Sequence, residues 1–481
     1  MKRIHSIITA CLLFVFTFVQ AQEKAPVQSA SKPNILFILA DDLGYADLGC
    51  QGSKEIRTPH IDSLAKTGIR LTDAYVSAPQ CGPSRAGIMT GINQARFGYL
   101  DNNEHAGLPD QETLPLMPEL MKSAGYRTGL IGKWHIGQGT EYLIQNRAKN
   151  HMPLLPVDRI DCAEPWMRGF DEGMFIVGGG GYYFPFKKPF SNHPRSHYYT
   201  FNNAEKDPEE IRLGEDAYST DFFTDAALTF IKESKDEPFF LYLSYTAPHS
   251  PLQAKPEDIA ANSHIQDKNR RIFAGMMTCL DNNIGRVLDL LDEEGLRENT
   301  LIVFMSDNGG PTGIGTGKNT SRNDPFTGKK GDVHEGGIRV PCIMSWTGVF
   351  PAGTIYSKAA SSLDLLPTFA AVAGAKLNTN VQYDGLNLIP YLKANPSINT
   401  PPHEILYWRW REKKALRYGD YKWLDAGNDY GAQQNYGLFD LSKSSKENSE
   451  TILNEPERLN ELEHIYTKYW KDHSKELIPE N

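Results

Sequence analysis

The sequence predicts an α/β fold in which a large mixed, mostly parallel sheet lies between helices, followed by a smaller α+β domain. The first observation is a set of nearly continuous apolar runs of strand length, which are typical of parallel strands buried on both faces. These runs are Asn34–Ala40, Arg127–Gly132, Pro238–Tyr245 and Thr300–Met305. The second observation is that segments with helical spacing of apolar residues separate the runs, so strands and helices alternate along the chain.

Four segments between the runs are predicted as helices. Pro59–Thr67 has a proline in its first turn and ends before Gly68, which is the usual asymmetry of helix ends. The other three carry apolar residues at helical spacing, the pattern of a helix with one buried face. They are Leu114–Ala124, Asp221–Lys232 and Arg270–Leu291. With the strands, these helices predict a catalytic α/β domain over residues 33–377.

The pattern changes from about Asn378. Ala415–Trp423 and Tyr436–Leu441 have the length and composition of short antiparallel strands. Pro456–Lys471 is predicted as a terminal amphipathic helix. We therefore expect residues 378–481 to form a C-terminal α+β domain with a small antiparallel sheet and a helix.

Residues 1–21 are predicted to be a signal peptide, and residues 22–32 a polar tether. Lys2 and Arg3 precede the apolar run Ile7–Val19, and Val19-Gln20-Ala21 is a small-x-small cleavage site. A lipid anchor at Cys11 is disfavoured because the apolar run continues past that residue. The run is too short for a membrane span, and no later segment offers one. The protein is therefore expected to be exported, periplasmic or secreted, and without a membrane span.

The composition of the 481-residue chain excludes several classes of protein. Hydrophobic residues make up 40% of it, which is too many for a disordered chain. The net charge of −9 argues against a nucleic-acid partner, which would require a basic surface. Six cysteines in a chain of this length do not make a disulfide scaffold.

All four predicted strands end in polar or ionisable residues, and this coincidence predicts an active site. These residues are Asp41-Asp42, Lys133-Trp134-His135, Thr246-Ala247-Pro248-His249 and Ser306-Asp307-Asn308. In sheets of this kind, ligands bind beyond the carboxyl ends of the strands.

Asp41, Asp42, Asp307 and Asn308 together offer three carboxylates and one amide, an all-oxygen set suited to a hard cation. Ca²⁺ accepts irregular oxygen cages more easily than Mg²⁺ and is therefore the preferred expectation. No histidine or cysteine stands at these two strand ends, which argues against zinc. For Asp41-Asp42 alone, a solvated turn is the competing interpretation.

A short motif begins at residue 81 with Cys81-Gly82-Pro83-Ser84-Arg85 and continues with a small-residue helix start and Thr90-Gly91. It resembles the signature of the formylglycine-dependent sulfatases, which are arylsulfatase-like members of the alkaline phosphatase superfamily. Further motifs match that family in the expected order over nearly all of the chain after the signal peptide. They are Asp41-Asp42, Gly132–His135, Arg168–Asp171, Pro248-His249, Ser306–Gly309, Lys330 with Gly331–Pro341, Asp364–Thr368 and Gly419–Lys422.

The resemblance implies that a maturation enzyme oxidises Cys81 to formylglycine (3-oxoalanine). In that family the aldehyde hydrates to a diol, of which one hydroxyl attacks sulfur and the other later expels sulfate. Residue 81 also joins Asp41, Asp42, Asp307 and Asn308 around the cation. Pro83 and Ser84 are predicted to begin a helix whose dipole favours an anion beside residue 81.

The resemblance and the charges of the matched residues suggest their roles. Arg85 is expected to hold the diol and a metal ligand, and Lys133 and Lys330 to grip sulfate oxygens. Lys330 is preferred to Lys329 because it directly precedes the glycine of its motif. The remaining roles are His249 as acid for the leaving alcohol, His135 as base in the second step, and Asp307 as both metal ligand and acceptor of the nucleophile's proton.

The resulting hypothesis is a sulfuric ester hydrolase acting on a sulfated carbohydrate. A phosphomonoester or phosphonate monoester hydrolase of the same superfamily is the first alternative, and an inactive sugar-binding protein is the second. Gly178–Phe201 and Leu406–Glu412 combine aromatic and basic residues, which suit an anionic sugar and equally suit packing between domains.

Overall fold

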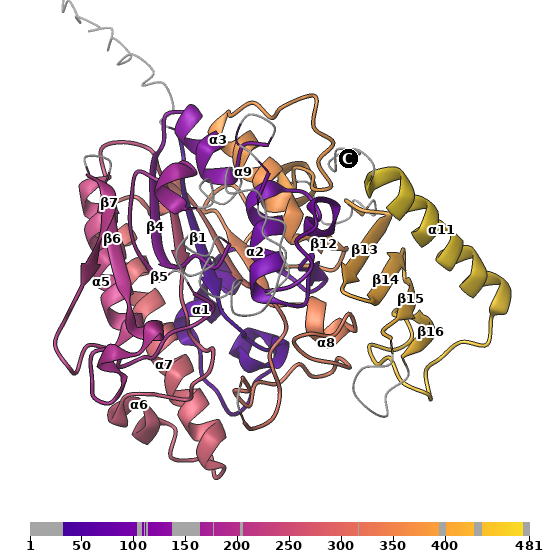
Figure 1. Cartoon of the computed structure of the whole chain (residues 1–481), viewed down its shortest axis with the longest axis horizontal. Helices are drawn as coiled ribbons and strands as arrows, with labels where there is room; N and C mark the ends of the chain where they lie inside the picture. Colours follow the sequence, from indigo (N-terminus) through magenta and orange to yellow (C-terminus); the bar gives the residue numbers. More distant parts are fainter. Residues whose placement is uncertain are drawn as a thin grey trace, which may run out of the picture. The chain divides into compact units, whose positions relative to one another are not determined.

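The computed structural model describes residues 32–102, 108–109, 111, 114–136, 164–176, 178–202, 205–315, 317–393, 401–427 and 435–474 (Figure 1). The predicted signal peptide and the tether up to residue 31 lie outside the described residues. Residues Lys32–Asn481 form one compact unit. None of the described helices combines the length and the hydropathy that a membrane span requires.

The main element of the described chain is a ten-stranded sheet in the order β11-β2-β10-β9-β1-β8-β4-β5-β6-β7. Its strands are β1 (Asn34–Ala40), β2 (Ile69–Leu71), β4 (Arg127–Lys133), β5 (Glu172–Ile176), β6 (Tyr198–Asn202), β7 (Glu205–Ile211), β8 (Phe239–Ser244), β9 (Thr300–Ser306), β10 (Cys342–Ser345) and β11 (Thr354–Tyr356). The central strands β9, β1, β8, β4 and β5 are parallel, whereas β10, β6 and β7 run antiparallel to their inner neighbours. The four strands predicted from the sequence are therefore adjacent at the centre, and the mixed, mostly parallel sheet is confirmed. A separate two-stranded parallel pair consists of β3 (Ala74–Tyr75) and β12 (Ala360–Ser361).

Alternate residues of β1 pack into two different hydrophobic cores. Ile35, Phe37 and Leu39 lie in one core together with apolar residues of α2 (Cys81–Thr90), α3 (Met117–Ser123) and α9 (Leu365–Ala373). Leu36, Ile38 and Ala40 lie in the other core with α1 (Pro59–Thr67), α5 (Ser219–Glu233) and α7 (Lys268–Glu293). Helices thus cover both faces of the sheet, which explains why the strand has no polar side (Figure 1). Shorter helices are α6 (Pro256–Ala261), α8 (Glu335–Ile338) and α10 (Ile389–Lys393).

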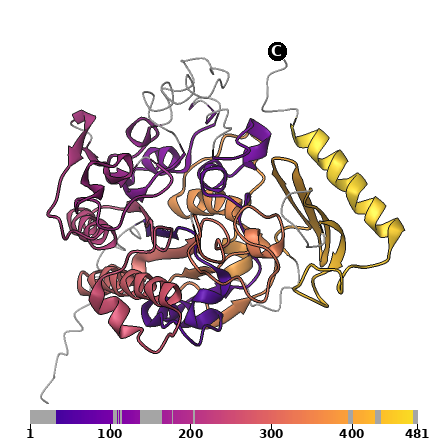
Figure 2. The same cartoon turned by 60° about the horizontal axis from the view of Figure 1, so that its bottom comes forward.

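The C-terminal part contains a four-stranded antiparallel sheet and a long helix, as the sequence predicts. Its elements are β13 (Ile405–Trp410), β14 (Lys413–Tyr418), β15 (Tyr421–Asp425), β16 (Tyr436–Asp440) and α11 (Pro456–Ser474). Helix α11 lies along this sheet, and its Leu462 and Tyr466 pack against Trp423 (Figure 2). The predicted segment Ala415–Trp423 is a hairpin of two strands, and β13 is a strand that the sequence interpretation did not include. The domain boundary near residue 378 stays a prediction.

A buried ionic network joins this small sheet to α8 and, through Tyr75, to β3. The Lys422 ammonium lies 2.8 Å from a carboxylate oxygen of Glu335 and 2.8 Å from one of Glu447, and all three side chains are inaccessible to solvent. The Tyr75 hydroxyl donates to the other oxygen of Glu335 at 2.7 Å. Because none of these charges reaches water, removal of the lysine leaves two buried carboxylates with less compensation.

We expect Lys422→Met to lower the free energy of unfolding by about 3–5 kcal/mol, since it breaks a buried ion pair and leaves two buried carboxylates with less compensation. The measurement is urea unfolding of the purified protein. Lys414→Met on the neighbouring strand is the control, because Lys414 pairs with Asp425 at the surface and should contribute about 0–1 kcal/mol. Equal losses in the two variants would contradict a structural role of the buried network.

Candidate active site

The structure brings all the residues predicted for the site to one edge of the large sheet, beyond the carboxyl ends of its central strands. Asp41 and Asp42 follow β1, Lys133 ends β4 and precedes His135, His249 lies in the loop after β8, and Asp307 and Asn308 follow β9. Cys81 and Arg85 belong to α2, and Lys330 precedes α8. The polar residues at the predicted strand ends are therefore neighbours in space, as expected for parallel strands that end at a common edge.

Asp42 is the centre of one half of this cluster. The Lys330 ammonium lies 2.7 Å and 2.9 Å from its two oxygens, and the Asn308 amide donates to Oδ1 at 2.7 Å. His249 Nε2 is 3.4 Å from Oδ2 of the same carboxylate. The Lys330 ammonium also lies 3.1 Å from the sulfur of Cys81, so it links the carboxylate to the predicted nucleophile.

Arg85 and Lys133 hold the other half of the cluster. The Arg85 guanidinium donates from Nε to Asp307 at 2.9 Å and from Nη1 to the hydroxyl of Ser244 at 2.6 Å. The Lys133 ammonium donates to Asp41 at 2.8 Å. Both cations and both carboxylates are inaccessible to solvent, so each carboxylate depends on its partner for compensation.

The backbone around the site adopts conformations that side chains normally avoid. Asp42 and His135 have φ values of 64° and 54° without being glycine. Gly132 has φ 110°, and a Cβ there would lie 1.8 Å from the carbonyl oxygen of Ser244. Such strain persists where surrounding structure enforces it, and it is typical of functional sites.

The positive charge near Asp41 does not fully compensate the burial of its carboxylate. Burial raises the pKa of Asp41 to about 7, in spite of the opposing effect of Lys133. Although burial alone would raise the pKa of Asp42 as well, Lys330 and His249 lower it to about 2. A further cation beside Asp41 would favour its ionised form.

The unsatisfied oxygens of the cluster fit such a cation. Asp41 Oδ1 and Asn308 Oδ1 are buried and accept no hydrogen bond from the described part of the chain. Possible ligand atoms of Asp41, Asp42, Cys81 and His249 all lie within 4.8 Å of one another. This group contains Asp41 and Asp42 of the predicted set, whereas the oxygens of Asp307 accept from Arg85 and from the backbone N–H of Asp42. His249, which the sequence interpretation assigned only as an acid, also lies within reach of the cation, so the absence of histidine from the strand ends no longer argues against zinc.

Cys81 is the first residue of α2, two residues earlier than the helix start predicted from Pro83 and Ser84. Its neighbour Gly82 donates its backbone N–H to Asn102 at 2.9 Å. Burial raises the pKa of the Cys81 thiol to about 11, although Lys133 and Lys330 act in the opposite direction. The unmodified side chain is therefore a neutral thiol at neutral pH, which is a weak nucleophile.

The two histidines are neutral in this environment. Burial, together with nearby cations, lowers the pKa of His135 well below its usual range, and its Nδ1 has no partner. Burial lowers the pKa of His249 to about 3, against the effect of Asp42. His249 Nδ1 lies 2.5 Å from the carbonyl oxygen of Ser250, so the tautomer that carries its proton on Nδ1 donates this bond.

The supporting residues that the sequence interpretation missed have no motif of their own. The Asn319 amide donates to the backbone carbonyls of Asp42 at 3.0 Å and Pro248 at 2.9 Å. It comes from a loop of otherwise unremarkable composition. Ser244, which contacts Arg85, had a weak signal as the polar residue near the end of an apolar run.

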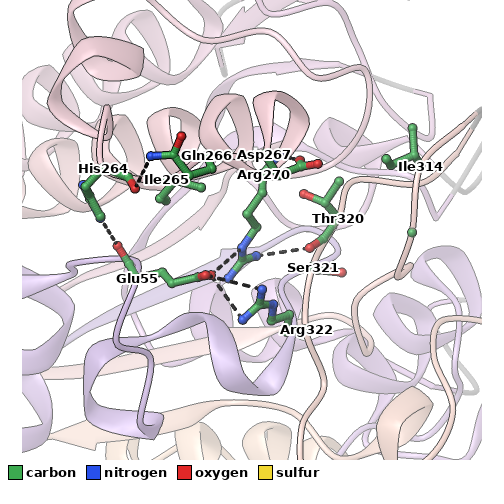
Figure 3. A pocket seen from close by; sticks show the side chains of 11 residues that line it. Glu55, His264, Ile265, Gln266, Asp267, Arg270, Ile314, Thr320, Ser321 and Arg322 are labelled. Atoms are coloured by element: carbon green, nitrogen blue, oxygen red, sulfur yellow. Dashed lines mark hydrogen bonds and ion pairs between the residues drawn. The ribbon is translucent and has the colours of Figure 1, made fainter.

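A separate hollow of about 610 Å³ is lined in part by residues of the same loop (Figure 3). Its lining includes Thr320 and Ile314 from the loop, and a charged group in which Arg270 and Arg322 both pair with Glu55. None of the predicted site residues lines it. The hollow is therefore distinct from the cluster at the strand ends.

Comparison with known proteins gives consistent matches. Residues 33–375 match a family model described as Sulfatase. The N-acetylgalactosamine-6-sulfatase of Canis lupus familiaris is 31% identical over 410 residues, which cover 81% of this chain and 71% of that protein. A crystal structure of Ps i-CgsB in complex with k-i-k-neocarrahexaose superposes with a TM-score of 0.77 at 34% identity, over 93% of this chain and 94% of that one.

A more distant structure matches in its fold alone. The phosphonate monoester hydrolase of Agrobacterium radiobacter superposes with a TM-score of 0.62 at 18% identity, over 92% of this chain and 96% of that one. The likeness is one of overall fold.

We expect Ca²⁺ to bind the metal-stripped protein and Asp41→Asn to weaken this binding by about tenfold or more, because it removes the charge of a buried ligand. Isothermal titration calorimetry after treatment with EDTA measures this directly, and Mg²⁺ should bind more weakly. Asp225→Asn is the control, since Asp225 is an exposed partner of Arg286. Unchanged affinity in Asp41→Asn would place the cation elsewhere.

Proposed function

Because this chain belongs to the sulfatase family and is a sulfatase, we propose that it removes sulfate from a sulfated carbohydrate, with Cys81 converted to formylglycine and Ca²⁺ as its cation. One observation carries the proposal. The sulfur of Cys81 lies 3.1 Å from the Lys330 ammonium, which also contacts Asp42, so nucleophile position, sulfate-binding lysine and cation site form one cluster.

The neutral thiol of Cys81 supports the need for its modification. Formylglycine would supply a hydrated aldehyde whose hydroxyl is the nucleophile. The Arg85 guanidinium is fully buried and fixed to Asp307 and Ser244, so it holds the carboxylate in place beside residue 81. Asp307 is the proposed acceptor of the nucleophile's proton.

The cation would be held by five residues, namely Asp41, Asp42, Asp307, Asn308 and residue 81. A divalent cation there supplies neutralisation of the carboxylates and polarisation of a sulfate oxygen. Lys133 and Lys330 lie at the same cluster and can donate hydrogen bonds to the other sulfate oxygens, which gain charge as the ester bond breaks.

His249 is the proposed acid for the leaving alcohol, and His135 the base in the second step. An acid must carry a second proton, which burial disfavours in the free protein, because the pKa of His249 is lowered to about 3. A bound anionic ester adds negative charge beside the ring and would raise this pKa. Protonation of His249 is therefore expected to accompany substrate binding.

The proposed substrate class draws on the relatives. The name of one is N-acetylgalactosamine-6-sulfatase, and another was solved with k-i-k-neocarrahexaose. Both are consistent with a sulfated sugar as substrate for this chain. The signal peptide predicted at residues 1–21 would export the enzyme to the periplasm or the medium, where such polysaccharide fragments are met.

The decisive experiment is desulfation of a panel of defined sulfated mono- and oligosaccharides, including k-i-k-neocarrahexaose, by protein matured with a formylglycine-forming enzyme. Matched aryl sulfate and aryl phosphate esters are assayed in parallel. Preference for phosphate would favour the phosphonate-hydrolase alternative, which the shared fold keeps open. No hydrolysis of any ester would favour the sugar-binding alternative.

Cys81→Ala is expected to abolish turnover and to leave sugar binding largely intact, because it removes the nucleophile and little volume. Mass spectrometry of the peptide containing residue 81 should show the aldehyde in the natural protein. Cys342→Ala, which changes another buried cysteine on β10, should keep both the aldehyde and the turnover. Turnover by Cys81→Ala would refute the formylglycine mechanism.

His249→Ala is expected to lower kcat on sugar sulfates by about a hundredfold or more, and much less on activated aryl sulfates. A sugar alcohol is a poor leaving group that requires a proton, whereas an activated phenol does not. The comparison of the two kcat ratios measures the acid role. Equal losses on the two esters would remove that role from His249.

A further inference from the structure

A run of four glycines, Gly178–Gly181, follows β5 at the edge of the sheet that carries the site. Strand β5 pairs in parallel with β4, so that Ile176 lies opposite Lys133. The backbone N–H of Trp134 donates to the carbonyl of Ile176 at 3.1 Å. The glycine run therefore leaves the sheet beside the segment that carries Lys133 and His135.

The two middle glycines lie against the two histidines of the site. A Cβ on Gly179 would lie 2.8 Å from Cε1 and 2.9 Å from Nε2 of His135. A Cβ on Gly180 would lie 2.8 Å from Nδ1 and 2.9 Å from Cε1 of His249. These distances are shorter than those that non-bonded carbon atoms accept, so only glycine permits each ring its present position.

The two outer glycines provide a contrast within the same run. Among the described residues, a Cβ on Gly178 would meet nothing within 4 Å, whereas one on Gly181 would meet the Tyr198 hydroxyl at 2.5 Å. Gly179, Gly180 and Gly181 lack the positive φ values that favour glycine, so the contacts of an added Cβ distinguish these positions. The contact with a histidine ring is therefore specific to the middle pair.

Tyr183 fastens the glycine segment to the loop that carries His249. Its hydroxyl lies 2.7 Å from the carbonyl oxygen of Thr246 and 2.8 Å from that of His249, and can donate to either. Its backbone N–H donates to the side chain of Gln253 at 2.9 Å. The segment that contains the glycines and the loop that carries His249 are thus tied together by hydrogen bonds of Tyr183.

We propose that Gly179 and Gly180 are positioning residues, whose bare backbone forms the wall that orients His135 and His249 towards residue 81. The inference rests on the proposed roles of these histidines. A methyl group at position 180 would turn His249 away from the leaving oxygen, and one at position 179 would displace His135. Misplacement of a catalytic group by about 1 Å costs on the order of a hundredfold in rate.

The test is an alanine scan of the run, with kcat and KM measured on a sugar sulfate and an activated aryl sulfate. Gly180→Ala should lower kcat on the sugar sulfate about tenfold or more beyond its effect on the aryl sulfate, with KM little changed. Gly179→Ala should lower kcat on both esters similarly, because His135 acts after the alcohol has left. Gly178→Ala should retain kcat within about twofold, since its methyl group has open space.

A double-mutant cycle separates positioning from loss of structure. In the His249→Ala background, Gly180→Ala should add no more than about a twofold loss, because the ring that it displaces is absent. A full multiplicative loss in that background would overturn the proposal. Gly181→Ala, which disturbs packing against Tyr198, should show no dependence on the leaving group, and selectivity there would also overturn it.

Tyr183→Phe is a second test of the positioning role, which applies if the alanine variants fold poorly. It removes only the hydroxyl that fastens the segment to the His249 loop, and should impair the sugar sulfate more than the aryl sulfate. Equal effects on the two esters would count against a positioning role. Hydrolysis of both esters by the unsubstituted enzyme establishes the underlying function separately, so failure of the positioning proposal is distinct from failure of the proposed function.

Discussion

The site depends on the compensation of three buried carboxylates that the sheet brings to one edge. Asp41, Asp42 and Asp307 follow adjacent parallel strands and have no access to water. Each has a cation of its own, namely Lys133, Lys330 and Arg85 respectively. Because buried charge is costly unless it is paired, the identity and position of these cations are constrained as strictly as those of the carboxylates. The unsatisfied oxygen of Asp41 shows that the compensation by protein groups alone is incomplete.

The same constraint explains why an acidic protein can accept an anionic ester. The chain has a net charge of −9, so its overall charge repels an anionic substrate. The lysines at the site and the expected cation concentrate positive charge within a few ångströms of residue 81. Local complementarity inside a buried cluster outweighs the distant charges, which solvent and salt screen.

The sequence predicted those features that short-range patterns encode. Continuous apolar runs identified β1, β4, β8 and β9, and their polar ends identified the cluster, because parallel strands must end at a common edge. The sequence could not show which strands are neighbours or where loops return. Three features depend on residues that are far apart in the chain. They are the hydrogen bonds of the Asn319 amide, the contacts of Gly179 and Gly180 with the two histidines, and the pairing of strand β13. The lowered pKa of His249 is likewise a property of its surroundings and not of its motif.

Long-range contacts also make the C-terminal sheet part of the support for the site. Lys413, on β14, donates to the carbonyl of Gly331 at 2.7 Å and lies 3.1 Å from the carboxylate of Asp332, directly after the catalytic candidate Lys330. Lys422 holds Glu335 a few residues further on. The segment that positions Lys330 is therefore fixed at two points by charges from the small sheet. It follows that the small sheet bears on the position of the Lys330 ammonium between Asp42 and residue 81, because this ammonium is only as well placed as the loop that carries it.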